Sequence, residues 1–151
     1  ISQSKYRKKF ITQNLINNLV KDYKILVFGQ NLYVLDRGSK NGDFRHSGSG
    51  IRNFTTDIPN ELLEFAYECY IQLDVPNSSL DIGFDGNNYY LIEYQSLYFG
   101  SYTISYSEFY WNRKLNGSFE KIHDKSLLEK EYAQSIISFI RKNEDSIYFK
   151  R

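Results

Sequence analysis

The stretch LDIGFDGNNYYLIEYQ, residues 80–95, decides the fold. Two runs rich in β-forming residues flank the turn sequence DGNN (residues 85–88), which is typical of a β-hairpin. A turn at this point places Asp81 nearly opposite Glu93 on the neighbouring strand. Gln95 shares the face of Glu93, because side chains alternate between the faces of a strand. The sequence therefore predicts two carboxylates and one amide on the same side of a sheet.

Carboxylates that face each other repel, so this pair predicts a compensating cation or a shared proton. Oxygen ligands of this kind suit Mg²⁺ or Mn²⁺. The alternative is that Asp81 and Glu93 face solvent and pair with Lys or Arg. A zinc site is disfavoured, because the two histidines lie far apart at His46 and His123 and the chain has a single cysteine.

A second hairpin is predicted upstream, where KILVF (residues 24–28) and LYVLDR (residues 32–37) flank a short segment that contains Gly29. A glycine-rich loop follows over residues 38–54. Its backbone amides could bind an anion, and Arg45 within it could bind a phosphoryl oxygen. The loop does not match the P-loop pattern, and plain flexible connectors have the same composition.

Helical spacing of apolar residues predicts a short helix over residues 13–21. A second helix is expected after Asp57 as N-cap, with Pro59 in its first turn, ending before Pro76. A capping box formed by Ser126 and Glu129 predicts a third. Its expected apolar face is Leu128, Tyr132, Ile136, Phe139 and Ile140. The predicted class is α+β, with a largely antiparallel sheet built from two hairpins and helices packed on one face.

The amino-acid composition limits the classes of function that the chain can have. Nineteen basic and eighteen acidic residues among 151 leave a net charge of +1, so no global field predicts nucleic acid or a membrane as partner. No stretch is long and apolar enough to predict a membrane span. Cys69, the single cysteine, excludes an internal disulfide and fits a cytoplasmic protein. The chain begins at Ile1 and contains no Met, so we expect a portion of a larger protein.

Several segments together resemble the C-terminal lobe of the ATP-grasp ligases, including the ribosomal-protein glutamate ligases. Residues 10–16 (FITQNLI) look like the family's hinge segment, and residues 22–29 (DYKILVFG) like the acidic-x-basic strand that follows. Arg37 and the DFR of residues 43–45 look like the arginines of the next strand and loop. Asp81 with EYQ (residues 93–95) looks like the family's Asp…Glu-x-Asn metal motif. The resemblance covers about residues 10 to 100.

The resemblance implies a role for each matching position. Arg37 and Arg45 would face the phosphates and the acyl-phosphate intermediate. The residues that would bind the nucleotide are Gln13, Asn14, Leu15 and Ile16, which line the adenine pocket, with Asp22 and Lys24 nearby. The residues that would hold one or two Mg²⁺ (or Mn²⁺) ions are Asp81, Glu93 and Gln95. In such enzymes ATP phosphorylates a carboxylate substrate, and an amine or another nucleophile then displaces the phosphate.

The chain departs from the family in two respects. Gln95 replaces the usual Asn, and no counterpart of the family's preceding lobes stands ahead of Phe10. We therefore expect a basic N-terminal segment (1–9), the ATP-grasp-like lobe (10–122) and a C-terminal helix packed on the same lobe (123–151). The missing N-terminal lobes are the expected partner, and the lobe alone is expected to be inactive.

Two other classes remain open. One is a non-catalytic module that binds a carbohydrate or a protein partner through an exposed row of Tyr98, Tyr102 and Tyr106. The other is a degenerate nucleotide-binding lobe, which the Gln95 replacement permits. Both alternatives predict nucleotide binding, if any, that does not depend on a metal ion.

Overall fold

A computed structural model describes residues 12–16, 18–38, 52–97 and 99–144. The elements follow in the order β1 (Lys21–Phe28), β2 (Asn31–Arg37), β3 (Arg52–Asn53), α1 (Asn60–Leu73), β4 (Asn77–Phe84), β5 (Tyr89–Gln95), α2 (Tyr102–Tyr106), β6 (Tyr110–Arg113), β7 (Phe119–Ile122) and α3 (Leu128–Lys142). The strands form one antiparallel sheet in the order β5-β4-β1-β2-β6-β7, with β3 paired to β2. The predicted α+β class and antiparallel sheet are confirmed.

Both predicted hairpins are confirmed. β1 and β2 are joined by Gly29 and Gln30, and Gly29 has a φ of 60°, a conformation that favours glycine. The β4–β5 turn is closed by Asp85, whose carboxylate accepts the backbone N–H groups of Asn87 and Asn88 at 2.8 Å each. Hydrogen bonds to its carboxylate lower the pKa of Asp85, and the bond from the Asn88 backbone has the largest effect.

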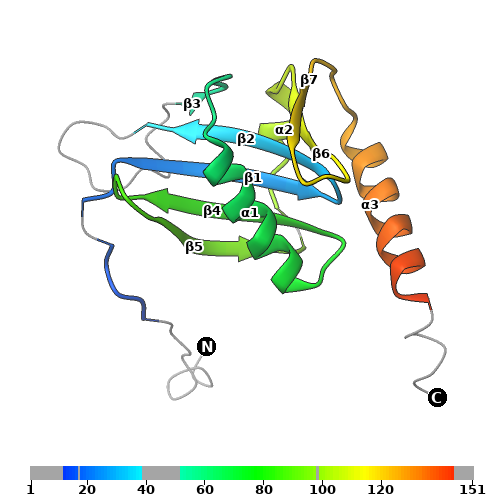
Figure 1. The fold of residues 1–151 in the computed structure, drawn as a ribbon, viewed down its shortest axis with the longest axis horizontal. Coiled ribbons are helices and arrows are strands. Elements are labelled where there is room, and N and C mark those ends of the chain that lie inside the picture. Colours follow the sequence, from blue (N-terminus) through cyan, green and yellow to red (C-terminus); the bar gives the residue numbers. More distant parts are fainter. Residues whose placement is uncertain (1–11, 17, 39–51, 98, 145–151) are drawn as a thin grey trace, which may run out of the picture.

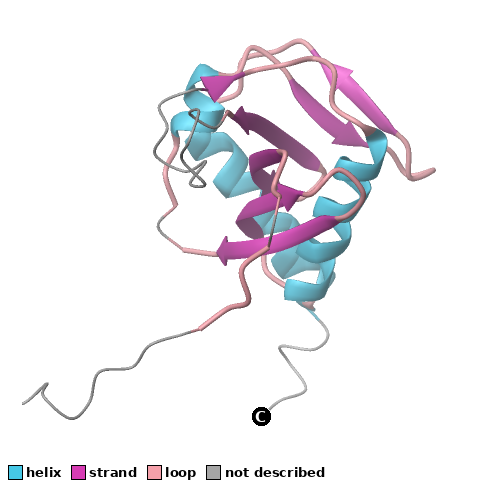
Figure 2. Cartoon of the chain, turned by 90° about the vertical axis from the view of Figure 1, so that its left-hand side faces the viewer, coloured by secondary structure: helices cyan, strands magenta, loops and turns pink. Residues whose placement is uncertain are grey.

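The helices cover both faces of the sheet rather than one, as the views in Figures 1 and 2 show. On the first face α1 packs against β1, β4 and β5. The apolar core there includes Ile25, Val34 and Leu80, which are fully buried or nearly so. On the second face Ile104 of α2 and Phe99 pack on the far ends of β1 and β2. Alternate residues of β1 pack into the apolar cores on the two faces of the sheet, so this strand lies between the two cores.

The N-terminal part of the described chain contains no helix, so the helix predicted over residues 13–21 is wrong. Lys21 begins β1, and the backbone N–H of Val20 donates to the carbonyl of Phe84 at 2.8 Å, which continues the pairing towards β4. Of the apolar residues that suggested a helix, Leu15 and Val20 are largely exposed, at 73% and 61%. Leu19 packs over Gly83, where a Cβ would come within 2.7 Å of its side chain.

The ends of α1 differ slightly from the prediction. The N-cap is Pro59, so Asp57 does not cap the helix; its N–H instead donates to Thr55 Oγ1 at 3.1 Å. Since Pro59 has an extended ψ of 138°, the helix can begin only after it. The helix ends at Asp74 in the left-handed conformation, ahead of Pro76, as expected.

The third predicted helix is present as α3, and Leu128 and Tyr132 of its predicted apolar face pack against the core on the second face of the sheet. Its buried residues are Glu131 and Ser135, whereas Ile136 and Ile140 of the predicted apolar face are exposed. The predicted capping box is also absent, because Ser126 donates to the Glu131 carboxylate and makes no cap. None of the helices within the described ranges has the length and apolar character needed to cross a membrane.

Candidate functional site

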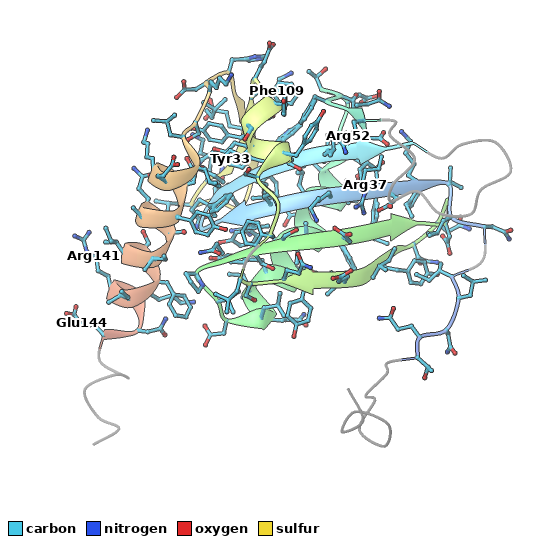
Figure 3. The ribbon with its side chains drawn as sticks, turned by 180° about the vertical axis from the view of Figure 1, so that it is seen from behind. Tyr33, Arg37, Arg52, Phe109, Arg141 and Glu144 are labelled. Carbon is cyan, nitrogen blue, oxygen red and sulfur yellow. The ribbon has the colours of Figure 1, made fainter. Side chains whose placement is uncertain are left out.

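The second face of the sheet carries a group of charged and polar side chains beyond the part that α2 and α3 cover. β1 lies between β2 and β4, so residues from three sequence regions become neighbours: Asp22 pairs with Arg37, Lys24 with Asp81, and Asp81 with Glu93. Gln95 lies two residues along β5. We call this group the polar cluster; it consists of Asp22, Lys24, Arg37, Asp81, Glu93 and Gln95. Figure 3 views the face on which Arg37 lies.

The predicted register of the β4–β5 hairpin is thus confirmed: Asp81 stands directly opposite Glu93. A β-bulge between Asp81 and Ile82 shifts the pairing by one residue in the half of the hairpin nearer the turn. Ile92 is the extra residue. The bulge leaves Glu93 and Gln95 on the side of Asp81.

Arg37 is the centre of the ion pairs in the polar cluster. Its Nη2 lies 2.5 Å from Asp22 Oδ1 and its Nη1 lies 3.1 Å from Asp81 Oδ2. The Arg37 and Asp22 side chains are only 13% and 6% exposed. Burial alone would lower the pKa of Arg37, but the charges of Asp22 and Asp81 outweigh it, so the pKa is raised.

Asp81 therefore has compensating charges of its own. Its Oδ1 lies 3.1 Å from Lys24 Nζ, while its Oδ2 lies 3.1 Å from Arg37. This corrects the expectation that a metal ion is needed to compensate Asp81. Counting three acids and two bases, the polar cluster has a net charge of −1. The sequence contained the signal, because the alternation of Asp22 and Lys24 places both on one face of β1.

Glu93 is the exposed acid of the polar cluster. Its Oε1 accepts a hydrogen bond from Gln95 Nε2 at 3.1 Å. A cavity of about 30 Å³, room for about one water or ion, is lined by Lys24, Ser79, Asp81, Glu93 and Gln95. Ser79 Oγ is buried and has no hydrogen-bond partner among the described residues. Ser79 was not predicted as a site residue, because a lone serine in a strand carries no recognisable pattern.

The oxygen donors around this cavity suit a hard cation such as Mg²⁺. Two of them are the carboxylates of Asp81 and Glu93, and the others are the amide oxygen of Gln95 and the hydroxyl of Ser79. Across the described part of the chain, no three His, Cys, Asp or Glu residues come together as a metal-binding group. A cation here would therefore rely on neutral oxygens and on ligands supplied by a bound molecule.

The segment expected to bind adenine lies beside β5. Gln13 Nε2 donates to the carbonyl oxygen of Ile92 at 3.1 Å. A groove of about 560 Å³ is lined by Gln13, Asn14, Leu15, Ile16 and Leu19 together with Phe65, Tyr89, Tyr90, Leu91 and Ile92. This groove is distinct from the small cavity, but both use β5, since Ile92 precedes Glu93. Arg45, the other predicted phosphate ligand, lies outside the described residues.

The aromatic residues around α2 stack on one another. The rings of Tyr102 and Tyr106 are stacked with their centroids 4.4 Å apart, and the Arg52 guanidinium lies 4.0 Å from the centroid of Tyr102. Phe54 stacks on Tyr102 as well, at 6.3 Å. The rings of the two tyrosines therefore stack on each other and do not form a flat row. Tyr98 lies outside the described residues.

Comparisons with models of protein families, with curated proteins and with solved structures found no match.

Proposed function

We propose that this chain is the ATP- and Mg²⁺-binding lobe of a carboxylate–amine ligase, or of a related enzyme with another nucleophile, that acts through an acyl-phosphate intermediate. The resemblance to the C-terminal lobe of the ATP-grasp ligases motivates the proposal. The observation that carries it is that Asp81, Glu93 and Gln95 converge with Lys24 and Arg37 on one face of the sheet.

The polar cluster has the mixture of charges that a metal-bound polyphosphate requires. Lys24 and Arg37 are donors for phosphoryl oxygens, through the ammonium group and the Nη1 that bond Asp81 in the absence of nucleotide. Glu93, Gln95 and Asp81 would hold Mg²⁺, which when bound neutralises phosphate charge and orients the transferred group. Since the polar cluster carries only one net negative charge, we expect Mg²⁺ to bind well only together with the nucleotide.

The ion pairs of Asp81 define how nucleotide binding and metal binding are linked. While Lys24 and Arg37 bond both of its oxygens, Asp81 is a poor ligand for a metal ion. Phosphates that accept hydrogen bonds from the two bases would release these oxygens. Nucleotide binding would thereby prepare Asp81 to hold the metal ion.

The adenine would bind along β5 in the groove that Gln13, Asn14, Leu15 and Ile16 line. The groove supplies apolar surface from Phe65 and Ile92, as well as backbone groups of the N-terminal segment. The carboxylate substrate and the remaining phosphate ligands would come from other lobes of the same protein. Free Cys69 and the use of ATP favour a cytoplasmic location.

A second candidate is a nucleotide-binding lobe that works without a metal ion. It is favoured by the same ion pairs, because Asp81 needs no cation when Lys24 and Arg37 neutralise it. This candidate keeps the groove and the basic donors, but it lacks the step in which Mg²⁺ assists phosphoryl transfer.

Calorimetric titration of the chain with ATP, with and without Mg²⁺, separates the two candidates. The ligase lobe predicts that Mg²⁺ tightens ATP binding at least about tenfold, a free-energy difference of about 1.4 kcal/mol. It also predicts that Mg²⁺ alone binds weakly. Equal ATP affinity in both buffers would favour the metal-free lobe, and no ATP binding in either buffer would contradict both candidates.

A further inference from the structure

Glu131, in the first turn of α3, is a buried acid without a basic partner in the described part of the chain. It is only 3% exposed. Its Oε2 accepts a hydrogen bond from Asn31 Nδ2 at 2.9 Å, and its Oε1 accepts one from the Ser126 hydroxyl. No Lys, Arg or His among the described residues forms an ion pair with it, whereas Asp81 has two basic partners.

The charge of Glu131 is therefore only partly compensated. A carboxylate that has lost its water destabilises the folded state unless nearby groups compensate its charge. The Asn31 and Ser126 donors are neutral, and the N-terminal end of α3 contributes only a partial positive charge. Each carboxylate oxygen accepts one of these hydrogen bonds and has a further lone pair. Glu131 can therefore still bind a cationic donor.

Glu131 lies in the wall of a groove of about 650 Å³ between α3 and the turn that joins β1 to β2. Figure 1 shows the ends of β1 and β2 that this turn joins beside α3. The volume is typical of ligand-binding pockets. The groove is separate from the polar cluster, because it lies at Phe28 and Asn31, whereas the polar cluster lies near the other ends of these two strands.

The groove carries opposite charges on its α3 wall. Arg141 lines it together with Glu131, and Arg141 forms no ion pair with another described residue. The two residues are ten positions apart in α3, so they are separated by about 15 Å along the helix axis. The groove is also lined by polar side chains that can hydrogen-bond a peptide group: Gln30, Asn112, Gln134 and Ser138.

We propose that this groove binds a short peptide with free termini, whose ammonium group pairs with Glu131 and whose carboxylate pairs with Arg141. An extended tripeptide is about 10 Å long, since each residue spans about 3.4 Å. The side chains of Glu131 and Arg141 reach over the remaining distance. The amide and hydroxyl groups of the groove hydrogen-bond the peptide backbone, whose polar groups need partners once they leave water. This binding does not depend on nucleotide at the polar cluster.

The charges of the groove favour a peptide over other cations. A divalent metal ion prefers several carboxylates, and no three His, Cys, Asp or Glu residues come together anywhere in the described part of the chain. A polyamine would bring a second positive charge towards Arg141. A peptide with free termini instead presents one charge of each sign, and the guanidinium of Arg141 can bond both oxygens of its carboxylate.

NMR titration of the 151-residue chain with trialanine tests the proposal. We expect saturable shifts of the backbone amide signals of residues 28–31 and 131–141, with a dissociation constant of about 1 mM. N-acetyl-trialanine lacks the ammonium group and should bind at least about tenfold more weakly. Trialanine amide lacks the carboxylate and should bind about threefold more weakly, because Arg141 is exposed. Equal affinities for trialanine and N-acetyl-trialanine, or no binding of trialanine, would overturn the proposal.

Variants assign the two contacts. Glu131→Gln keeps the shape of the side chain and should weaken trialanine binding at least about tenfold, while leaving the weaker binding of N-acetyl-trialanine unchanged. A merely structural role of Glu131 would lower the affinities for both peptides alike and would overturn the assignment. The matched control is Glu129→Gln, because Glu129 is an exposed acid in the same helical turn.

Arg141→Gln should weaken trialanine binding about threefold and leave the binding of trialanine amide unchanged. Equal losses for the two peptides would overturn the contact between Arg141 and the carboxylate. Circular dichroism confirms that each variant is folded. If Glu131→Gln does not fold, the comparison of trialanine with N-acetyl-trialanine on the original chain still decides whether the groove binds the ammonium group.

Discussion

Arg37 determines the charge balance of the site, because one guanidinium binds acids from two other strands. It reaches Asp22 on β1 and Asp81 on β4, and all three side chains are at least four-fifths buried. Buried ion pairs add little net stability when intact, but removing one partner leaves charge in a medium that solvates it poorly. The polar cluster is therefore sensitive to the loss of its bases, independently of any nucleotide.

Arg37→Met is expected to lower the free energy of unfolding by about 3 kcal/mol, because it removes the positive charge beside two acids. Lys24→Met should cost about 1 kcal/mol, since the Lys24 side chain is more exposed, at 22%. Urea denaturation followed by circular dichroism measures both values. Equal and small losses in the two variants would show that Arg37 does not hold the polar cluster together.

Two buried tyrosines predict a loss of stability in alkali. Burial, with a smaller contribution from Asp36, raises the pKa of Tyr23 from 10.0 to about 12, and burial likewise raises the pKa of Tyr70 to about 12. The unfolded chain ionises both groups near pH 10, so the stability they contribute is present below pH 10 and is lost as the pH rises towards 12. The loss approaches about 1.4 kcal/mol per pH unit for each tyrosine.

Thermal or urea unfolding between pH 9 and pH 12 measures this loss of stability as a slope against pH. Tyr23→Phe should reduce the slope, since the variant has one fewer group that ionises only on unfolding. An unchanged slope in Tyr23→Phe would show that Tyr23 ionises equally readily in the folded and unfolded chains.

Among the elements, the hairpins were predictable because a short turn sets the register of its own strands. The DGNN turn was enough to place Asp81 opposite Glu93. The order of the strands in the sheet was not predictable, because β1 meets β4 only through a contact between distant segments. That contact places Lys24 beside Asp81, which is why the sequence left open whether a cation or a basic side chain compensates this acid.

Helical spacing was a weaker guide than turn chemistry. Residues 13–21 have a helical pattern of apolar residues, but pairing between Val20 and Phe84 competes with a helix there. In α3 the pattern correctly predicted the helix and the packing of Leu128 and Tyr132, whereas Ile136 and Ile140 of the predicted face are exposed. Glu131 is buried in place of Ile136 because Asn31 and Ser126 satisfy its carboxylate. Such polar partners become visible only once the tertiary contacts are known.

Gly83 keeps the N-terminal segment close to β4 and β5. A Cβ at this position would lie 2.7 Å from Leu19 Cδ2 and 3.0 Å from Ile92 Cδ1. Gly83→Ala should therefore displace Leu19 and Ile92, destabilise the fold by about 1–2 kcal/mol and weaken ATP binding, because both residues line the groove. Calorimetry and urea denaturation measure the two effects. Gly100→Ala is the control, because a Cβ there meets nothing within 4 Å.

The second face of the sheet has two parts: packed helices cover one end, and the remaining part carries the proposed binding site. α2, α3 and Phe99 cover the end that contains Leu26, Phe28 and Tyr33. The polar cluster lies on the remaining part, next to the groove along β5. If ATP bridges the groove and the polar cluster, its contacts should be confined to the side of the sheet formed by β1, β4 and β5.

Hydrogen exchange with and without Mg²⁺ and ATP tests this division. Protection should increase in residues 12–16 and in the β4–β5 hairpin, because the nucleotide covers and orders both segments. The β6–β7 hairpin should not change. Protection that appears mainly around α2 would contradict the proposed location of the nucleotide. It would favour the stacked rings of Tyr102 and Tyr106 as the binding surface.

The most direct test of the central claim is the Mg²⁺ dependence of ATP binding in the Glu93→Gln variant. Because Glu93 is exposed, the free energy of unfolding of the variant should lie within about 0.5 kcal/mol of that of the original chain. Glu68→Gln on exposed α1 surface is the matched control. We predict that Mg²⁺ tightens ATP binding at least about tenfold in the original chain and in Glu68→Gln, but less than about threefold in Glu93→Gln. The same Mg²⁺ enhancement in all three proteins would contradict a metal site formed by Glu93 and Asp81.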